Sequence, residues 1–234
     1  MARFIFLCIG LFFISEVLAQ SSQSDIPFEH ISIPGTINST QVNDMVIDQY
    51  GLIWIASDGL YRYDGYKFTS YKQISDTQTI TGKEIICLMT DRQTNKLYLG
   101  THSYGIVEYN YDTNSFRIIP SKGGIPIITK ITQTTDGTIW AGSFSNGVFR
   151  IQNDTLKKVI DQGSKFRLPT SLLALGNSLL IDNSKEIYIL KNGLLTDSIL
   201  VQYPNTVFPV TTRLTAMMAD REGKIWLGWN GVVY

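Results

Sequence analysis

The chain has 234 residues, and its 20 basic side chains balance its 20 acidic ones, so the formal net charge at pH 7 is zero. Neither sign forms a long run, which disfavours nucleic-acid binding, because neutralising phosphates requires a basic patch. Outside the first 19 residues only one cysteine is present, Cys87, so neither a disulfide framework nor a cysteine-rich metal site is available.

Residues 1–19 have the pattern of a secretory signal peptide. Arg3 precedes an apolar stretch from Phe4 to Ile14, and small residues at Val17 and Ala19 precede Gln20. The apolar stretch is short for a membrane span, and an uncleaved anchor is the alternative. We therefore expect an exported protein whose mature chain begins at or near Gln20. N-terminal sequencing of exported material that still contains Met1 would contradict this.

Residues 20–41 are interpreted as a lead-in that contains one strand. Phe28 to Ile33 alternates apolar and polar side chains, and Pro34-Gly35 ends the alternation. From residue 42 onward the sequence consists of repeats.

The best-formed repeat contains the stretch Gln49–Gly65. Leu52–Ile55 is a short run of strand-forming residues. Asp58-Gly59 is a strong hairpin signal, typical of a type I′ turn with positive φ at both residues. Alternating residues follow at 61–63 and again at 67–71, so this stretch predicts three of the four strands of one sheet.

Weaker copies of this stretch recur along the chain. Aromatic residues occupy the same phase of the repeat at Trp54, Tyr98, Trp140 and Trp226, separated by 44, 42 and 86 residues. Repeats of about 40–50 residues with four short strands each are typical of a β-propeller. A helical solenoid is excluded by the strand periodicity, and a β-sandwich would not explain the fixed aromatic phase. We expect repeats at approximately 42–80, 81–122, 123–165 and 166–208, and a partial repeat at 209–234.

The aromatic phase has a physical reason. Each sheet of a propeller buries its faces against its neighbours, and a bulky mid-strand ring fills the gap between them. We therefore predict that Trp54, Trp140 and Trp226 are core residues. The glycines that follow, at 100, 142 and 228, are expected to leave room for a neighbouring backbone.

The residues Asp48–Asp64 read D-Q-Y-G-L-I-W-I-A-S-D-G-L-Y-R-Y-D. They resemble the two-component regulator propeller repeat, whose pattern is roughly D-x-x-G-x-I-W-I/V-G-T-x-x-G-L-x-R-Y-D/N. Ala56-Ser57 departs from the usual Gly-Thr, and the second repeat has Tyr98 in place of Trp. The resemblance implies the periplasmic sensor region of a membrane-bound hybrid two-component regulator. It also implies oligosaccharide ligands, dimerisation through regions beyond this chain, a membrane contact only through a downstream segment, and a histidine kinase or DNA-binding output.

No catalytic constellation is recognisable in the sequence. The two histidines, His30 and His102, have no metal-ligand partner at i+4, and no nucleophile, phosphate-binding or zinc motif occurs. We expect no cofactor, no metal and no enzymatic activity in this segment. Four recurring aspartates precede or lie within turns, where Asp caps its own backbone, namely Asp48, Asp91, Asp136 and Asp220.

The loops that follow the aromatic strands are the candidate ligand-binding site, because propeller strands carry the packing. These loops combine aromatic rings, which stack on sugars, with groups that hydrogen-bond to hydroxyls. The candidate residues are His102, Tyr104, Phe144, Asn146, Trp229 and Asn230. The alternative is that these rings cover the rim of each sheet and the polar groups satisfy turns. The alternative function is a secreted β-propeller polysaccharide lyase or hydrolase with acidic residues lining its channel.

The last repeat provides only three strands. We therefore expect four blades and most of a fifth, forming the N-terminal part of a larger propeller with two open apolar faces. The alternative is a five-bladed ring, in which Phe28–Ile33 pairs beside Val232–Tyr234 as the missing strand.

Overall fold

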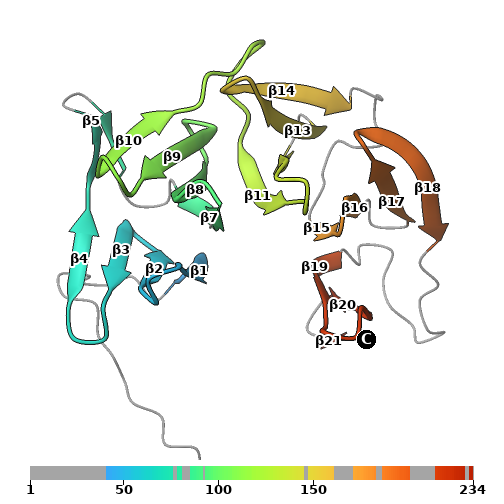
Figure 1. Ribbon diagram of the computed structural model, residues 1–234, viewed down its shortest axis with the longest axis horizontal. Helices are drawn as coiled ribbons and strands as arrows, with labels where there is room; N and C mark the ends of the chain where they lie inside the picture. Colours follow the sequence, from blue (N-terminus) through green and yellow to red (C-terminus); the bar gives the residue numbers. More distant parts are fainter. Residues whose placement is uncertain are drawn as a thin grey trace, which may run out of the picture. The chain divides into compact units, whose positions relative to one another are not determined.

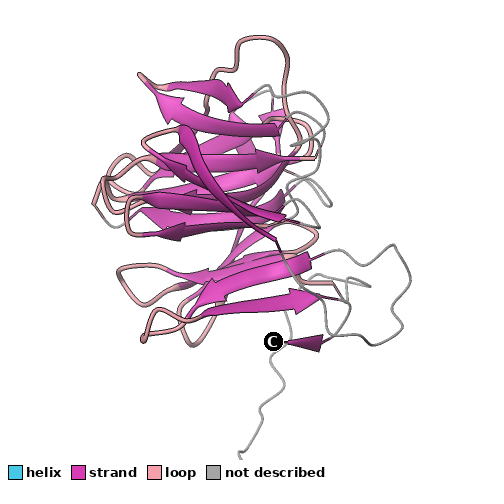
Figure 2. Ribbon diagram, turned by 90° about the vertical axis from the view of Figure 1, so that its right-hand side faces the viewer, coloured by secondary structure: helices cyan, strands magenta, loops and turns pink. Residues whose placement is uncertain are grey.

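The computed structural model describes residues 41–75, 78–80, 85–91, 93–144, 147–160, 171–182, 186–200, 214–229 and 232–233. The predicted signal peptide, residues 20–40 of the lead-in with the strand Phe28–Ile33, and Tyr234 lie outside these residues. Within the described residues the chain is all β, so no helix there could span a membrane (Figure 2).

Four four-stranded antiparallel sheets follow one another along the chain, each with its strands in sequence order (Figure 1). The first contains β1 (Asp44–Ile47), β2 (Ile53–Ala56), β3 (Leu60–Tyr63) and β4 (Phe68–Tyr71). The second contains β7 (Ile85–Asp91), β8 (Lys96–Thr101), β9 (Ile106–Asn110) and β10 (Ser115–Ile118). The third contains β11 (Ile128–Gln133), β12 (Ile139–Ser143), β13 (Gly147–Gln152) and β14 (Thr155–Ile160). The fourth contains β15 (Leu172–Leu175), β16 (Ser178–Asp182), β17 (Glu186–Lys191) and β18 (Leu194–Leu200).

A fifth sheet contains three strands, β19 (Leu214–Ala219), β20 (Ile225–Trp229) and β21 (Val232–Val233). A small pair, β5 (Gln73–Ser75) and β6 (Gln78–Thr79), connects the first two sheets. The first strand of each sheet contacts the first strand of the next, from β1 through β7, β11 and β15 to β19. The fold is therefore the expected β-propeller, with four blades and most of a fifth.

The hairpin at Asp58-Gly59 is confirmed, but the predicted turn type is wrong. Neither residue has a positive φ. Ala56 pairs with Leu60, and the three residues between them are closed by the Ser57 N–H, which donates to the Gly59 carbonyl at 3.0 Å. A three-residue connection of this kind does not need the two left-handed residues that a type I′ turn requires.

The aromatic anchors fill the gaps between sheets as predicted in the first three repeats. Trp54 is fully buried, and its ring lies 5.0 Å from Tyr71 of its own sheet and 5.2 Å from Tyr109 of the next. Tyr98 and Trp140 are also buried. The prediction is wrong for Trp226, which is 42% exposed.

Gly100 shows which groups approach the glycine that follows an anchor. A Cβ atom at this position would overlap the Cys87 sulfur and would lie 2.7 Å from Cγ2 of Ile128, on the first strand of the next sheet. The expectation of a neighbouring backbone is therefore wrong for Gly100. Two side chains, one from its own sheet and one from the next, occupy the space that the missing Cβ leaves.

Candidate ligand-binding site

The loops between the second and third strands lie at the same end of each sheet as the start of its first strand. This follows from the antiparallel register, in which Asp44 pairs with Ala56, Cys87 with Gly100 and Ala216 with Gly228, each just before such a loop. We call this side of the sheets the loop end. Side chains from several blades can converge where such ends meet.

The structure describes three of the six predicted site side chains. His102 is exposed, and Phe144 is 52% exposed while its N–H donates to the Ile127 carbonyl at 3.0 Å. Tyr104 is half-buried against the core shared by the first two sheets. No described hydrogen bond or ring contact brings these three together. Asn146, Asn230 and the Trp229 side chain lie outside the description, so their predicted role stays a prediction.

A pocket of about 190 Å³ opens at the loop end, and sequence analysis did not predict it. All five sheets contribute to it from the beginning of their first strands or from the residue just before. We call it the inner-strand pocket. The polar side chains in its wall are Asn43, Asp44, Thr129, Lys130 and Ser171, and Cys87 and Met217 add sulfur atoms.

Hydrogen bonds between consecutive first strands hold this pocket together. The Asp44 carboxylate accepts the Leu88 N–H through Oδ2 at 2.9 Å, which joins the first sheet to the second. Ser171 Oγ accepts the Met217 N–H at 3.1 Å, which joins the fourth sheet to the fifth. Both bonds satisfy N–H groups on edge strands, which would otherwise lack a partner strand. We call these two contacts the inter-blade bonds.

Cys87 occupies the position on the second sheet that Asp44 occupies on the first. Burial raises the pKa of its thiol to about 12, although the Lys130 charge opposes this and the Asp44 charge adds to it. A protonated thiol is a poor nucleophile and a poor metal ligand. The expectation that Cys87 is a buried small hydrophobe is therefore confirmed.

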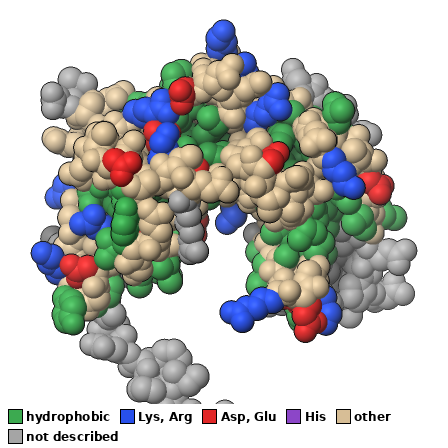
Figure 3. All heavy atoms as spheres, in the orientation of Figure 1, with side chains coloured by type: hydrophobic (Ala, Val, Ile, Leu, Met, Phe, Trp, Pro, Cys, Tyr) green, Lys and Arg blue, Asp and Glu red, His purple; other side chains and the backbone are tan. Residues whose placement is uncertain are grey.

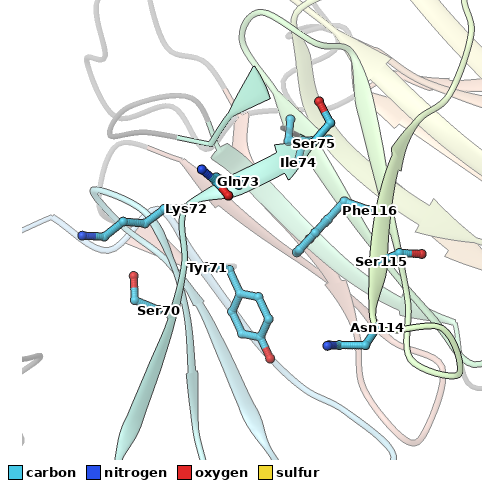
Figure 4. Close-up of a pocket in the computed structure, with 9 residues that line it drawn as sticks. All are labelled: Ser70, Tyr71, Lys72, Gln73, Ile74, Ser75, Asn114, Ser115 and Phe116. Carbon is cyan, nitrogen blue, oxygen red and sulfur yellow. The ribbon is translucent and has the colours of Figure 1, made fainter. Parts of the chain in front are cut away.

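A second concave surface lies between the outer strands of the first two sheets (Figure 4). This groove of about 640 Å³ lies between the segment Ser70–Ser75 and the residues Asn114–Phe116, and we call it the rim groove. Tyr71 and Phe116 both project into it, with ring centroids 5.9 Å apart. The Asn114 side chain accepts the Tyr109 hydroxyl at 2.6 Å, which holds its amide in the wall. Its lining is mainly neutral and polar, with two aromatic rings.

Charged side chains do not gather into a patch of one sign on the face that Figure 3 presents, where basic and acidic residues are interspersed. Among the described residues, the most buried ion pairs centre on Glu108, which accepts from Arg117 at 2.7 Å and from Lys96 at 3.2 Å. Burial raises the pKa of Glu108, but these two cations outweigh it and hold the pKa below its usual value. This carboxylate is therefore neutralised within the protein.

Comparisons with known proteins identify the fold. No protein-family model and no curated protein matches the sequence. Among solved structures, the extracellular domain assigned to the hybrid two-component system BT3049 from B. thetaiotaomicron is similar, with 20% identity and a TM-score of 0.69 over 88% of this chain. The corresponding domain of BT4673 from the same organism has 22% identity and a TM-score of 0.63 over 86% of this chain.

A third similar structure is virginiamycin B lyase from Staphylococcus aureus, with 14% identity and a TM-score of 0.63 over 80% of this chain and 63% of the lyase. The chain spans 30% of the BT3049 structure and 28% of the BT4673 structure. These likenesses establish a β-propeller. Two of the three come from the class of protein that the sequence repeat resembles.

Proposed function

We propose that this chain is the periplasmic ligand-sensing region of a hybrid two-component regulator and that it carries out no catalysis itself. The observation that carries the proposal is the agreement of the sequence repeat with the fold. The repeat at Asp48–Asp64 resembles the regulator propeller repeat, and the fold is that of extracellular domains of hybrid two-component systems. Membrane anchoring, dimerisation and the output module belong, in this proposal, to parts of the protein outside these 234 residues.

The competing function is that of a secreted propeller enzyme acting on a polysaccharide. The similarity of the fold to virginiamycin B lyase supports this alternative. The lyase has a lower sequence identity to this chain than the two sensor domains have. Within the described ranges, no three His, Cys, Asp or Glu side chains gather in a way that could hold a metal ion. Incubation of the purified protein with plant and host polysaccharides tests the choice. New reducing ends or unsaturated products would contradict the sensor proposal, and binding without product formation would support it.

The ligand that we propose is an oligosaccharide, and the proposed contacts lie at the loop end. The exposed Phe144 ring and the exposed His102 imidazole offer a stacking surface and a hydrogen-bonding group. The two rings of the rim groove, Tyr71 and Phe116, offer a second surface of similar chemistry. Aromatic stacking next to neutral polar groups suits sugar rings, which have apolar faces and hydroxyl edges.

Replacing Phe144 by Ala should weaken oligosaccharide binding roughly two- to twelvefold, since a contact on an aromatic ring is worth roughly 0.5–1.5 kcal/mol. The melting temperature should hardly change, because half of the ring is already in solvent. Titration calorimetry against an oligosaccharide panel, with parallel melting curves, measures both. Leu194→Ala is the matched control, an exposed apolar residue at the opposite end of its sheet.

Tyr104→Ala separates the two interpretations of these loops. Its ring packs against the core of the first two sheets, so its loss should lower the melting temperature. Unchanged binding in Phe144→Ala would remove Phe144 from the proposed site and would favour the aromatic residues of the rim groove.

A further inference from the structure

Three of the five first strands carry a β-bulge at the inner-strand pocket. The register shifts between Ile85 and Cys87 on β7, between Ile128 and Lys130 on β11, and between Leu214 and Ala216 on β19. A bulge leaves one residue without an opposite partner and re-aims the neighbouring side chains, and bulges are enriched next to functional sites. The shifted residues Ile86 and Thr129 line the pocket. The geometry of the first strand is therefore altered in three of the five sheets at the place where the pocket opens.

Lys130 is the cation of this pocket. It follows the bulge on β11 and pairs with Gly142, just as Cys87 pairs with Gly100 and Asp44 with Ala56. It is half-buried, and none of the carboxylates in the described ranges lies within ion-pair distance of its ammonium group. Its charge reaches the pocket interior, since it lowers the pKa of the Cys87 thiol against the dominant effect of burial.

The acid in the same pocket is already engaged. Asp44 accepts the Leu88 N–H through one carboxylate oxygen and the Met45 N–H through the other, both at 2.9 Å. Ser171, across the pocket, uses its oxygen as an acceptor for Met217, which leaves its hydroxyl hydrogen for an incoming acceptor. The donors still available in the described wall therefore include the Lys130 ammonium, the Ser171 hydroxyl and the second N–H of the Asn43 amide, whose other N–H donates to the Ile85 carbonyl at 2.8 Å.

We infer that the inner-strand pocket binds the carboxylate of a small acidic ligand and that Lys130 selects it. The inference rests on the proposed sensor function, because it names the chemical class that the sensor would detect. An ammonium group in a partly enclosed site binds a carboxylate by a charge-assisted hydrogen bond, which is stronger than a neutral one. A volume of about 190 Å³ admits one small acid or one acidic sugar ring rather than a long chain. Occupation would bridge first strands of several blades.

The test compares ligands that share a ring and differ in the acid. The probes are sodium D-glucuronate, D-glucose and sodium acetate, titrated into the wild-type chain and followed by calorimetry and melting temperature. Wild type should bind glucuronate about tenfold more tightly than glucose. Acetate should bind detectably if the carboxylate is sufficient for recognition. If the sugar ring also contributes, glucuronate should bind and acetate should not. Both results support a carboxylate site.

Lys130→Gln should abolish the preference for glucuronate, whereas Lys130→Arg should keep it because the charge is retained. Lys157→Gln is the matched control, an exposed lysine on β14 of the same sheet, and should behave as wild type. If Lys130→Gln does not fold, the wild-type preference should instead weaken as NaCl rises from about 0.05 M to about 0.5 M. Equal binding of glucuronate and glucose by wild type, or a preference that survives Lys130→Gln, would overturn the inference.

The two proposals fail in different ways. Oligosaccharide binding without any preference for acidic ligands would contradict the proposed carboxylate site and would leave the proposed sensor function intact. Cleavage of a polysaccharide with an intact glucuronate preference would overturn the sensor function and leave the carboxylate site intact.

Discussion

The first and fifth sheets contain the same local motif in two different settings. In the first, Trp54 Nε1 donates to Asp48 Oδ2 at 2.8 Å, and Asp48 Oδ1 accepts two backbone N–H groups of the turn. In the fifth, Trp226 Nε1 donates to Asp220 Oδ2 at 2.8 Å, and Asp220 Oδ1 likewise accepts two N–H groups. Yet Trp54 is 0% exposed and Trp226 is 42% exposed.

The comparison separates local geometry from packing. The turn and the indole hydrogen bond form within seven residues, so they need nothing from the next blade. Burial of the ring does need it, since Trp54 is covered by Tyr109 of the second sheet. The motif therefore positions the ring, and the neighbouring blade provides most of the stabilisation.

The largest expected difference is between the two tryptophans. Trp54→Ala should reduce the free energy of unfolding by roughly 3–5 kcal/mol, the usual cost of a large cavity in a core. Trp226→Ala should cost about 1 kcal/mol, because much of its ring is already in solvent. Denaturant unfolding of the two variants measures both values, and equal losses would break the comparison.

The loss of stability should also be larger for Asp48→Ala than for Asp220→Ala. Asp48→Ala removes the acceptor of three donors at a site that is 3% exposed, and it should cost about 2–3 kcal/mol. Asp220→Ala should cost clearly less, since water can replace the lost bonds at an exposed turn. Thermal unfolding monitored by tryptophan fluorescence compares them. A larger loss in Asp220→Ala would show that the motif, rather than its burial, carries the stability.

The smallest expected effect concerns the contact between blades at Gly100. Gly100→Ala should cost about 1–3 kcal/mol, because the new methyl group overlaps Cys87 and crowds Ile128 of the next sheet. Gly59→Ala is the control, since its Cβ would meet only Tyr61 at 3.5 Å and its φ is not positive. A neutral result in calorimetric melting of Gly100→Ala would mean that the second and third sheets are less tightly packed than the distances indicate.

Sequence reasoning worked where the signal lies within one repeat. Strand periodicity and the capping role of Asp48 depend on neighbours in the chain, the aromatic spacing depends on the regular length of the repeat, and all three are present in the structure. In the third repeat the predicted capping role of Asp136 is confirmed, and the acceptor of the indole is a residue that sequence analysis did not name. Asp136 does cap its turn, but the Trp140 indole donates to Thr134, which has the place of Asp48 six residues before the ring.

The concave sites were missed because their residues come from different blades. Lys130, Asp44 and Ser171 are 41 to 127 residues apart, and no periodicity marks them as neighbours. The bulge that precedes Lys130 has no sequence signature of its own. Tyr71 and Phe116 offered a signal for the rim groove, an aromatic on the fourth strand of two consecutive repeats, but the strand that carries Phe116 was not predicted.

The inter-blade bonds have a consequence for how the chain is assembled. Asp44 is hydrogen-bonded to Leu88, 44 residues later in the chain, and Ser171 to Met217, 46 residues later. At these two junctions the earlier blade is joined to the blade that is made next, and neither bond requires a distant end of the chain. Short sequence separations favour rapid folding. A nascent chain can therefore complete one blade junction for roughly every 44 further residues that emerge, so that only the most recently made edge is exposed to aggregation at any time.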